Sequence, residues 1–323
     1  MAKMLINGQL AEKPRAPDGR FERFPSQYRH WISRQKDTEF PAETNRYHLF
    51  ISEACPWCHR VMILRALMGL EKFITVTYMD ALMGEEGWRI DPDRHPDLPG
   101  LYGDQFLYQT YLRDNPAYTG TITAPVLYDR KSERIVSTES SDIMRMFHQA
   151  FSGLTGKGQD LYPSALRGRI DRINDFVQDR IAEGVYRAGF ATSQDAYDTA
   201  VDRLVDGLSQ LEEMLCAQRY LAGERITEAD WRLYPVLLRF DPVYWIHFKI
   251  GPHRIADYSN LSAYLRELHQ IPGIAATVDM DHIRRHYFLS HRHLNPGGIM
   301  PRSPQFDLNQ SHNREKVVWR RVG

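Results

Sequence analysis

Residues 47–67 read YHLFISEACPWCHRVMILRAL, and this stretch decides the fold of the first half of the chain. Residues 47–51 are a short β-prone run, which predicts a strand. Residues 61–67 are apolar at helical spacing, and a Cys-Pro turn joins the two runs. The stretch therefore predicts a strand, a turn and a helix, with Cys55 at the start of the helix.

The runs that follow extend this unit into a sheet. Residues 73–78 predict a second strand, and a helix between two such strands makes a right-handed βαβ unit the default topology. Residues 125–128 and 134–137 flank a polar turn and predict a hairpin, after which Ser140 opens a helix. The order βαβ-ββα, with a cysteine turn after the first strand, is the thioredoxin-like arrangement.

The chain of 323 residues exceeds one average domain, so we expect two unequal domains with flanking segments. The expected divisions are an irregular arm over 1–45, a thioredoxin-like domain over 46–153, an all-helical domain over 154–300 and a tail over 301–323. The tail ends in a short basic stretch that we expect to pack on the surface. The predicted fold class is thus α/β plus all-α.

Helical spacing dominates the second half of the chain. Four segments carry it, at residues 164–183, 195–218, 227–241 and 258–270. Thr227 and Asp230 have the spacing of a capping box at the start of the third segment. In the first half, residues 81–123 have weak periodicity and are longer than structureless loops usually are, which suggests a functional insertion.

The composition excludes several classes of function. Lys plus Arg and Asp plus Glu both number 41, so no net positive field exists to hold a nucleic-acid backbone. No apolar run approaches membrane-spanning length, and the first residues lack the apolar stretch of a signal peptide. Only three cysteines occur, which is typical of a reducing compartment. We expect a soluble cytoplasmic protein that binds neither nucleic acid nor membranes.

Cys55 and Cys58 carry the predicted chemistry. Pro56 suits the first helical turn, which places the Cys55 sulfur beside unpaired amides and the positive end of the helix. This position favours the thiolate, the species that attacks sulfur. A zinc half-site or two inert thiols are the alternatives, but zinc needs a second pair of ligands, and Cys216 has no neighbouring Cys or His. Cys58 either resolves a mixed disulfide at Cys55 or packs against the sheet.

Two further segments can bind a peptide-like ligand beside Cys55. A cis bond at Ala124–Pro125 would turn the Ala124 backbone outward to pair with an extended ligand, whereas a trans bond would simply begin an edge strand. Residues 139–141, Glu-Ser-Ser, begin the next helix and either bind the ligand's amino and carboxylate groups or cap the helix alone.

These motifs together resemble the glutathione S-transferase superfamily, and more narrowly the glutathionyl-hydroquinone reductases, the omega-like Xi class. The resemblance runs from about Trp31 to Pro301. In the first half it is carried by Cys55-Pro56-Trp57, Tyr118-Thr119-Gly120, Ala124-Pro125-Val126-Leu127, Glu139-Ser140-Ser141 and Ile143-Met144-Arg145-Met146-Phe147. In the second half it is carried by Ala229-Asp230-Trp231-Arg232-Leu233, Arg239-Phe240-Asp241, Arg254-Ile255-Ala256-Asp257-Tyr258, Gln270-Ile271-Pro272-Gly273, His286-Tyr287 and Asn295-Pro296.

The resemblance implies glutathione-dependent reduction of a glutathionyl-hydroquinone through a Cys55–glutathione mixed disulfide, with release of oxidised glutathione. Glutathione is then a co-substrate, no metal is needed, and a homodimer is expected. The implied residues are Cys55 as nucleophile, Trp88, Ala124, Glu139 and Ser140 for glutathione, and Tyr186 and Tyr287 as hydroquinone ligands and proton donors. A phenol can hydrogen-bond a quinol, although ordinary helix packing would also account for both tyrosines.

Three positions depart from the family pattern. Cys58 stands where relatives commonly carry Ala, which opens a dithiol site. Thr121 stands where we expect Arg, and Ala124 stands where Val is usual. The last two departures suggest altered contacts to glutathione.

Three rival functions follow from the residues. Cys58 supports a broader glutaredoxin-like thiol transferase or dehydroascorbate reductase, because it offers an internal disulfide. A non-catalytic binding module with a transferase fold is the second rival, although the intact Cys55 turn argues against it. The third is a metal site at His282 and His286, which are four apart on one helical face, with His291 and His293 nearby.

Overall fold

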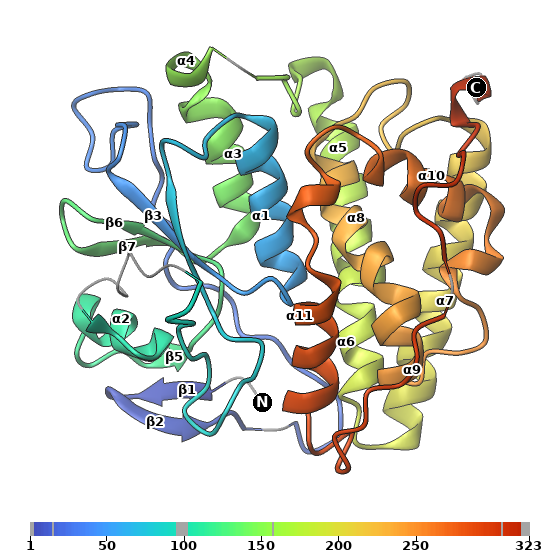
Figure 1. Ribbon diagram of the computed structural model, residues 1–323, viewed down its shortest axis with the longest axis horizontal. Helices are drawn as coiled ribbons and strands as arrows, with labels where there is room; N and C mark the ends of the chain where they lie inside the picture. The colour runs from blue at the N-terminus through green and yellow to red at the C-terminus, as the bar shows by residue number, and fades with distance from the viewer. Residues whose placement is uncertain (1–2, 15, 95–102, 157, 305, 318–323) are drawn as a thin grey trace. The chain divides into compact units, whose positions relative to one another are not determined.

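The computed structural model describes residues 3–14, 16–94, 103–156, 158–304 and 306–317, and Figure 1 shows its ribbon. The chain forms two compact units. The sheet unit comprises Met1–Pro14, Arg23–Gln159 and Thr277–Met300, and the helical unit comprises Arg15–Glu22, Asp160–Ala276 and Pro301–Gly323. This division differs from the one expected from sequence, because residues 277–300 pack with the sheet unit rather than with the helices.

The central sheet has the strand order β4-β3-β6-β7. Its strands are β3 (Tyr47–Ile51), β4 (Thr75–Tyr78), β6 (Val126–Asp129) and β7 (Arg134–Ser137). β4 runs parallel to β3, whereas β6 and β7 are antiparallel to their neighbours. Helix α1 (Pro56–Leu67) connects β3 to β4 and packs beside α3 (Ser140–Ala150), which follows β7 (Figure 1). The predicted thioredoxin-like arrangement is confirmed.

A second sheet, ordered β2-β1-β5, lies in the same unit. Strand β1 (Lys3–Ile6) pairs with β2 (Gln9–Glu12) on one side and with β5 (Gly120–Thr121) on the other. The prediction of an irregular arm was therefore wrong for its first residues. Asn7 and Gly8 have φ of 49° and 77°, and an Asn-Gly pair with two positive φ angles makes a two-residue hairpin turn.

The predicted insertion over 81–123 contains two elements of its own, helix α2 (Leu107–Asp114) and strand β5, while residues 95–102 lie outside the described part of the chain. It contributes to the core of the sheet unit. This core cluster is formed by Leu5, Phe50, Met79, Ile90, Leu107, Tyr111, Tyr118, Ile122, Val126, Tyr128 and Ile135. Trp88 and Ala124 are partly buried against it, so two predicted glutathione ligands have a shared apolar support.

The helical unit confirms the four predicted helical segments. Its main helices are α5 (Arg167–Phe176), α6 (Gly184–Gly189), α7 (Gln194–Ala217), α8 (Glu228–Arg239), α9 (Trp245–His247) and α10 (Ser259–His269). Wider π-helical turns continue α5 over Val177–Ala182 and α8 over Phe240–Tyr244. Strands are absent from the described residues of this unit. The sequence did not predict α6 or α9 as separate helices.

Shorter elements complete the chain. In the sheet unit, α4 (Ser152–Thr155) follows α3, and α11 (Met280–Arg285) continues into a π-helical turn over His286–Ser290. Single 3₁₀ turns lie at Ser164–Leu166, Ile255–Asp257, Ala275–Thr277 and Arg314–Lys316. No helix among the described residues is long and apolar enough to cross a membrane.

The start of α8 confirms the predicted capping box. One Asp230 carboxylate oxygen accepts hydrogen bonds from the Leu221 amide at 2.9 Å and the Tyr264 hydroxyl at 2.7 Å. The other oxygen accepts from the Thr227 amide at 2.8 Å. Burial raises the pKa of Asp230 above its usual range, although these donors act in the opposite direction. The carboxylate ties a loop, a helix start and α10 together, which is a structural role.

The predicted tail packs on the helical unit through Arg314. This guanidinium is buried, donates to the backbone carbonyls of Gln218 and Arg219 at 2.9 and 2.7 Å, and lies 3.3 Å from the Glu267 carboxylate. The last six residues of the tail, which include Arg320 and Arg321, lie outside the described residues.

Candidate active site

Cys55 occupies the N-cap position of α1, with extended backbone angles of φ −77° and ψ 120°. Its sulfur accepts a hydrogen bond from the Cys58 amide at 3.5 Å, and its thiol donates to the Ala124 carbonyl oxygen at 3.4 Å. The first turn of α1 has a proline and no acidic residue, so the positive end of the helix acts on the sulfur unopposed by a carboxylate of that turn. The half-buried Cys55 is therefore placed as the sequence predicted.

The Ala124–Pro125 peptide bond is cis, which is the first of the two alternatives considered from the sequence. The Ala124 backbone faces Cys55, and its side chain packs against the core cluster. Thr121, the second departure from the family pattern, pairs with Met4 across β5 and β1. Its hydroxyl is buried and makes no hydrogen bond to any residue that the structure describes.

Cys58 lies at the third position of α1 and is 0% exposed. Its sulfur accepts a hydrogen bond from the Ser52 amide at 3.4 Å, so it points back toward the loop between β3 and α1. Both cysteines are free thiols, as is Cys216, which is exposed on α7. The two thiols of the Cys-Pro-Trp-Cys turn thus share one helix start, with one partly accessible and one enclosed.

Glu139 and Ser140 lie together at the start of α3, where Arg60 of α1 reaches them. The Arg60 guanidinium donates to the Ser140 hydroxyl oxygen from two nitrogens at 3.0 and 2.5 Å, and it lies 3.6 Å from the Glu139 carboxylate. Glu139 is also the N-cap of α3 and accepts from the amide and hydroxyl of Ser141 at 3.0 and 2.8 Å. A buried arginine therefore ties the cysteine helix to the predicted ligand-binding helix start.

The carboxylate of Glu139 is held in its charged form. Burial acts to raise the pKa of this carboxyl group, but the Arg60 charge and the two Ser141 donors outweigh it, and the pKa of Glu139 lies below its usual range. The side chain keeps 28% of its surface exposed, so it can still meet a ligand from solvent. A charged, half-open carboxylate is suited to binding an ammonium group.

Trp88 of the predicted glutathione site is stacked on His286. The two rings lie 5.0 Å apart between centroids with an interplanar angle of 11°, and His286 Nδ1 is 3.0 Å from the Ala81 carbonyl oxygen. Since a carbonyl only accepts, Nδ1 carries the proton of this hydrogen bond. His286, which follows α11, therefore covers one face of the Trp88 ring.

The two predicted hydroquinone tyrosines belong to different compact units. Tyr287 is buried in the sheet unit and packs edge-on against His286 and His291, with centroid distances of 5.4 Å to each. Tyr186 lies in the helical unit and packs edge-on against Tyr244 and Phe248 at 6.0 and 5.6 Å. A joint pocket of the two tyrosines stays a prediction.

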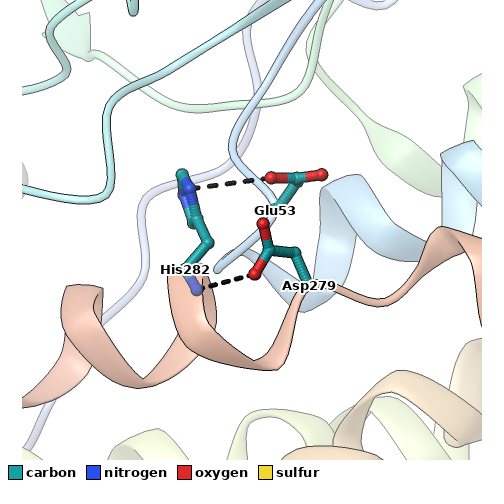
Figure 2. Close-up of side chains that lie close together, drawn as sticks. All are labelled: Glu53, Asp279 and His282. Atoms are coloured by element: carbon teal, nitrogen blue, oxygen red, sulfur yellow. Dashed lines mark hydrogen bonds and ion pairs between the residues drawn. The ribbon is translucent and has the colours of Figure 1, made fainter. Parts of the chain in front are cut away.

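A histidine and two carboxylates meet at Glu53, which precedes Cys55 by two residues, and Figure 2 shows the three side chains. The ligand atoms of Glu53, Asp279 and His282 lie within 4.8 Å of one another, and this is the one group of metal-ligand type among the described residues. Arg94 pairs with Glu53 and lies 3.7 Å from Asp279, so it offsets part of the charge of the two carboxylates. The group therefore behaves as an ion-pair network that joins the cysteine loop to α11.

The metal site considered from the sequence does not form as predicted. His282 Nδ1 faces Glu53 at 3.6 Å (Figure 2). His286, in contrast, contacts the Ala81 carbonyl and the Trp88 ring. Within the described residues, His286, His291 and His293 join no metal-ligand group. The two histidines at helical spacing therefore have different partners, Glu53 for His282 and Ala81 with Trp88 for His286.

Sequence reasoning missed Arg60 and His286 as parts of this site. Arg60 stands at the edge of an apolar helical run, and a charge in such a position signals a buried partner. His286 was considered as a metal ligand and as part of a family motif with Tyr287, but not as a residue that supports Trp88. His59 makes a further contact that was not predicted. Its Nε2 atom lies 2.8 Å from the Thr277 hydroxyl and joins α1 to the segment that carries His286.

Known proteins match the chain along most of its length. The model of the glutathione S-transferase N-terminal domain matches residues 54–150, and that of the C-terminal domain matches residues 194–267. The glutathionyl-hydroquinone reductase YqjG of Escherichia coli is 49% identical over 92% of this chain and 93% of its own. The glutathionyl-hydroquinone reductase PcpF of Sphingobium chlorophenolicum is 45% identical over 88% of this chain and 90% of its own.

Solved structures agree with this relationship. The glutathione-bound structure of YqjG has a TM-score of 0.86 at 46% identity and covers 98% of this chain and 100% of that chain. A Xi-class transferase from Natrialba magadii has a TM-score of 0.92 at 39% identity and covers 99% of this chain and 98% of that chain. Since both sequence and fold agree over nearly all of each molecule, the chain belongs to the glutathionyl-hydroquinone reductases, the omega-like Xi class of the glutathione S-transferases.

Proposed function

We propose that this protein reduces glutathionyl-hydroquinones to hydroquinones, with Cys55 as the nucleophile and glutathione as the reductant. The Cys55 thiolate attacks the sulfur that joins glutathione to the aromatic ring. A sulfur–sulfur bond forms, the carbon–sulfur bond breaks, and its electron pair stays on the ring carbon, which takes up a proton. The products are free hydroquinone and a Cys55–glutathione mixed disulfide.

The observation that carries this proposal is the position of the Cys55 sulfur. It receives the Cys58 amide hydrogen at the positive end of α1 and faces the Ala124 backbone, 3.4 Å away. An extended γ-glutamyl peptide that pairs with the Ala124 backbone would bring its own sulfur to Cys55. The reaction needs a sulfur nucleophile beside a peptide-binding backbone, and both features meet at this point.

The start of α3 suits the charged end of glutathione. Glu139 offers a charged carboxylate to the α-ammonium group. The oxygen of Ser140 already accepts two hydrogen bonds from Arg60, so its own O–H remains the group with which it can donate to the glutathione α-carboxylate. We assign Trp88 to the opposite side of the tripeptide, where its ring is held by His286.

The aromatic half of the substrate is assigned to Tyr287 and Tyr186. A phenol can donate its proton toward the ring carbon that loses sulfur, or hydrogen-bond a quinol hydroxyl group. The burial of both side chains would exclude water from this step. These two roles rest on the family resemblance and on residue chemistry.

A second glutathione completes the cycle. Its thiolate attacks the glutathione sulfur of the mixed disulfide, and oxidised glutathione leaves while the Cys55 thiolate is regenerated. Neither a metal nor a nucleotide takes part in this scheme. We place the reaction in the reducing cytoplasm, where three free thiols persist, and we propose a homodimer, which sedimentation at several protein concentrations would test.

The test is release of free hydroquinone from a glutathionyl-hydroquinone in the presence of glutathione. Wild-type protein should turn over, Cys55→Ala should not, and Cys216→Ala should match the wild type because that exposed thiol lies on α7. Absence of wild-type turnover would reject the reductase assignment. Turnover that survives Cys55→Ala would reject Cys55 as the nucleophile.

A further inference from the structure

We propose that Cys58 resolves the Cys55–glutathione mixed disulfide and gives this protein a dithiol route for reducing glutathione-containing disulfides. The inference rests on the proposed function only for Cys55 as the thiol that first takes up glutathione. Its substrates would be S-glutathionylated thiols, which belong to a different class from aromatic thioethers. Reduction of a glutathionyl-hydroquinone by itself needs only Cys55.

The first support is the relation of the two sulfurs to one helix. Cys55 is the N-cap, and Cys58 is the third residue of the helix, whose amide donates to the Cys55 sulfur at 3.5 Å. An N-cap side chain and the third helical residue lie over the same first turn, so the two thiols are neighbours without any refolding of α1. Both are free thiols, as a reduced dithiol requires.

The second support is the difference in exposure. Cys55 is partly accessible, whereas Cys58 is enclosed, with 0% of its surface exposed. A bulky glutathionyl donor can therefore reach only the outer sulfur. The inner sulfur can react with Cys55 from within, and this division of labour is that of an attacking thiol and a resolving thiol.

The third support is polar contact at the inner sulfur. Cys58 accepts a hydrogen bond from the Ser52 amide at 3.4 Å, which a cysteine kept only for apolar packing does not need. The Ser52 hydroxyl is also buried and has no hydrogen-bond partner among the residues that the structure describes. The inner sulfur therefore already has a polar contact on the side of the loop between β3 and α1.

The step balances with glutathione as the only other reactant. The Cys58 thiolate attacks the Cys55 sulfur, a Cys55–Cys58 bond forms, and glutathione leaves as its thiolate and takes up a proton. One glutathione then attacks Cys55 and frees Cys58, and a second glutathione attacks the new mixed disulfide and leaves as oxidised glutathione. The two electrons that reduce the internal disulfide come from these two glutathiones.

The decisive measurement is the fate of glutathione on the protein when no free glutathione is present. Reduced protein carrying Cys216→Ser, which removes the exposed third thiol, is treated with one equivalent of glutathione disulfide. Intact mass is then measured without reductant, and free thiols are counted. The parent should lose two thiols and keep no glutathione, while added Cys58→Ala should keep one glutathione on Cys55. We expect retention to differ by at least about 10-fold.

Further arms separate the alternatives. Cys58→Ser should behave as Cys58→Ala does, which guards against a packing defect of one variant. Cys55→Ser should take up no glutathione, because the remaining sulfur is enclosed. Equal retention of glutathione by the parent and by Cys58→Ala would overturn the inference, and so would rapid labelling of Cys58 in Cys55→Ser. Hydroquinone release by the wild type is scored separately, so failure of the proposed reductase remains distinguishable from failure of the dithiol route.

Discussion

The helix starts of α1 and α8 use the same local device for different purposes. In each, a side chain at the N-cap accepts from the backbone three residues on, Cys55 from the Cys58 amide and Thr227 from the Asp230 amide. In α8 the third residue returns a carboxylate that takes hydrogen bonds from a loop, the cap and α10. In α1 the acceptor is the Cys55 sulfur, 3.5 Å from the Cys58 amide nitrogen. The third residue of α1, Cys58, has a thiol where Asp230 of α8 has a carboxylate.

The difference shows that one kind of helix start can serve either the stability of the fold or the reactivity of a side chain. At α8 the polar groups named above satisfy one another, so the site has no capacity left for a ligand. At α1 the sulfur cap is long and weak, so the positive helix end remains available to stabilise charge on Cys55. A reactive helix start is therefore one whose cap is incomplete, and four predictions test this view.

Cys55→Ser should show the largest effect on activity with little effect on stability. Serine keeps a capping oxygen, but it lacks a thiolate, so glutathione-dependent turnover should fall by at least about 1000-fold, equivalent to about 4 kcal/mol in the barrier. The free energy of unfolding should stay within about 1 kcal/mol of the wild type, because serine is a good N-cap. Chemical denaturation beside the turnover assay checks both, and a strongly destabilised variant would contradict the comparison.

Asp230→Ala should show the opposite pattern. Its removal strands the buried amides of Leu221 and Thr227 and the Tyr264 hydroxyl, so the free energy of unfolding should fall by about 3 kcal/mol. The turnover rate per folded molecule should change little. Urea denaturation gives the first quantity, and Glu224→Ala, on an exposed neighbouring residue, is the matched control. A stable Asp230→Ala would show that this cap does not carry the stability assigned to it.

Glu139→Gln tests a helix start that both caps and binds. Loss of the charge that we propose meets the glutathione ammonium should raise KM for glutathione about 10-fold with kcat nearly unchanged, as expected for uniform binding. The matched control is Asp142→Asn, whose carboxylate lies in the same turn and pairs with Arg29 at 2.7 Å. It should alter KM less than about 2-fold. Steady-state kinetics with glutathione as the varied substrate decide between them.

The pKa of Glu139 gives the same prediction a pH dependence. Since the pKa is lowered in the folded protein, the stabilisation from its charge is complete above the ordinary value of 4.5 and is lost as pH falls through the lowered pKa. Its titration should therefore leave KM for glutathione unchanged between about pH 5.5 and 8. A step in KM within that range that disappears in Glu139→Gln would contradict the assignment.

Substitution of His282, in the first turn of α11, should have the smallest of these effects, on the pH dependence of stability. Burial lowers the pKa of His282 below its ordinary 6.5, although Glu53 and Asp279 oppose this, while Arg94 adds to it. The unfolded chain then takes up a proton before the folded chain does, so His282 lowers stability as pH falls below about 6.5. The difference between the melting temperatures at about pH 7 and 5.5 should be smaller in His282→Gln than in the wild type. An unchanged difference would show that another group titrates.

The sequence predicted the sheet and the position of Cys55 at a helix start because both depend on local pattern. Alternating β-prone and helical runs place Cys55 after β3, and the strand bounds of β3 and β7 agree with the prediction. The hairpin at Asn7 and Gly8 also had a local signal, an Asn-Gly dipeptide between two short runs, which the missing periodicity of the arm obscured.

The missing parts of the site depend on long-range contacts. Arg60 meets Ser140 across 80 positions, and Trp88 meets His286 across about 200, so no window of sequence reports either pair. The placement of residues 277–300 with the sheet unit has the same cause, because long-range contacts such as those of His59 to Thr277 and of Ala81 to His286 hold that segment. Helical spacing alone assigned these residues to the helical domain.

The pairing of β1 with β5 has a practical consequence for handling the protein. Met4 and Leu5 lie opposite Thr121 and Gly120, three or four positions before the cis bond at Ala124. A deletion that begins at Lys3 would remove strand β1, and an affinity tag fused directly before Lys3 would strain it. This strand pairs with β5, which leads to the backbone that we propose binds glutathione. Purification handles are therefore better placed elsewhere, and trimmed variants are expected to lose affinity for glutathione before they lose their fold.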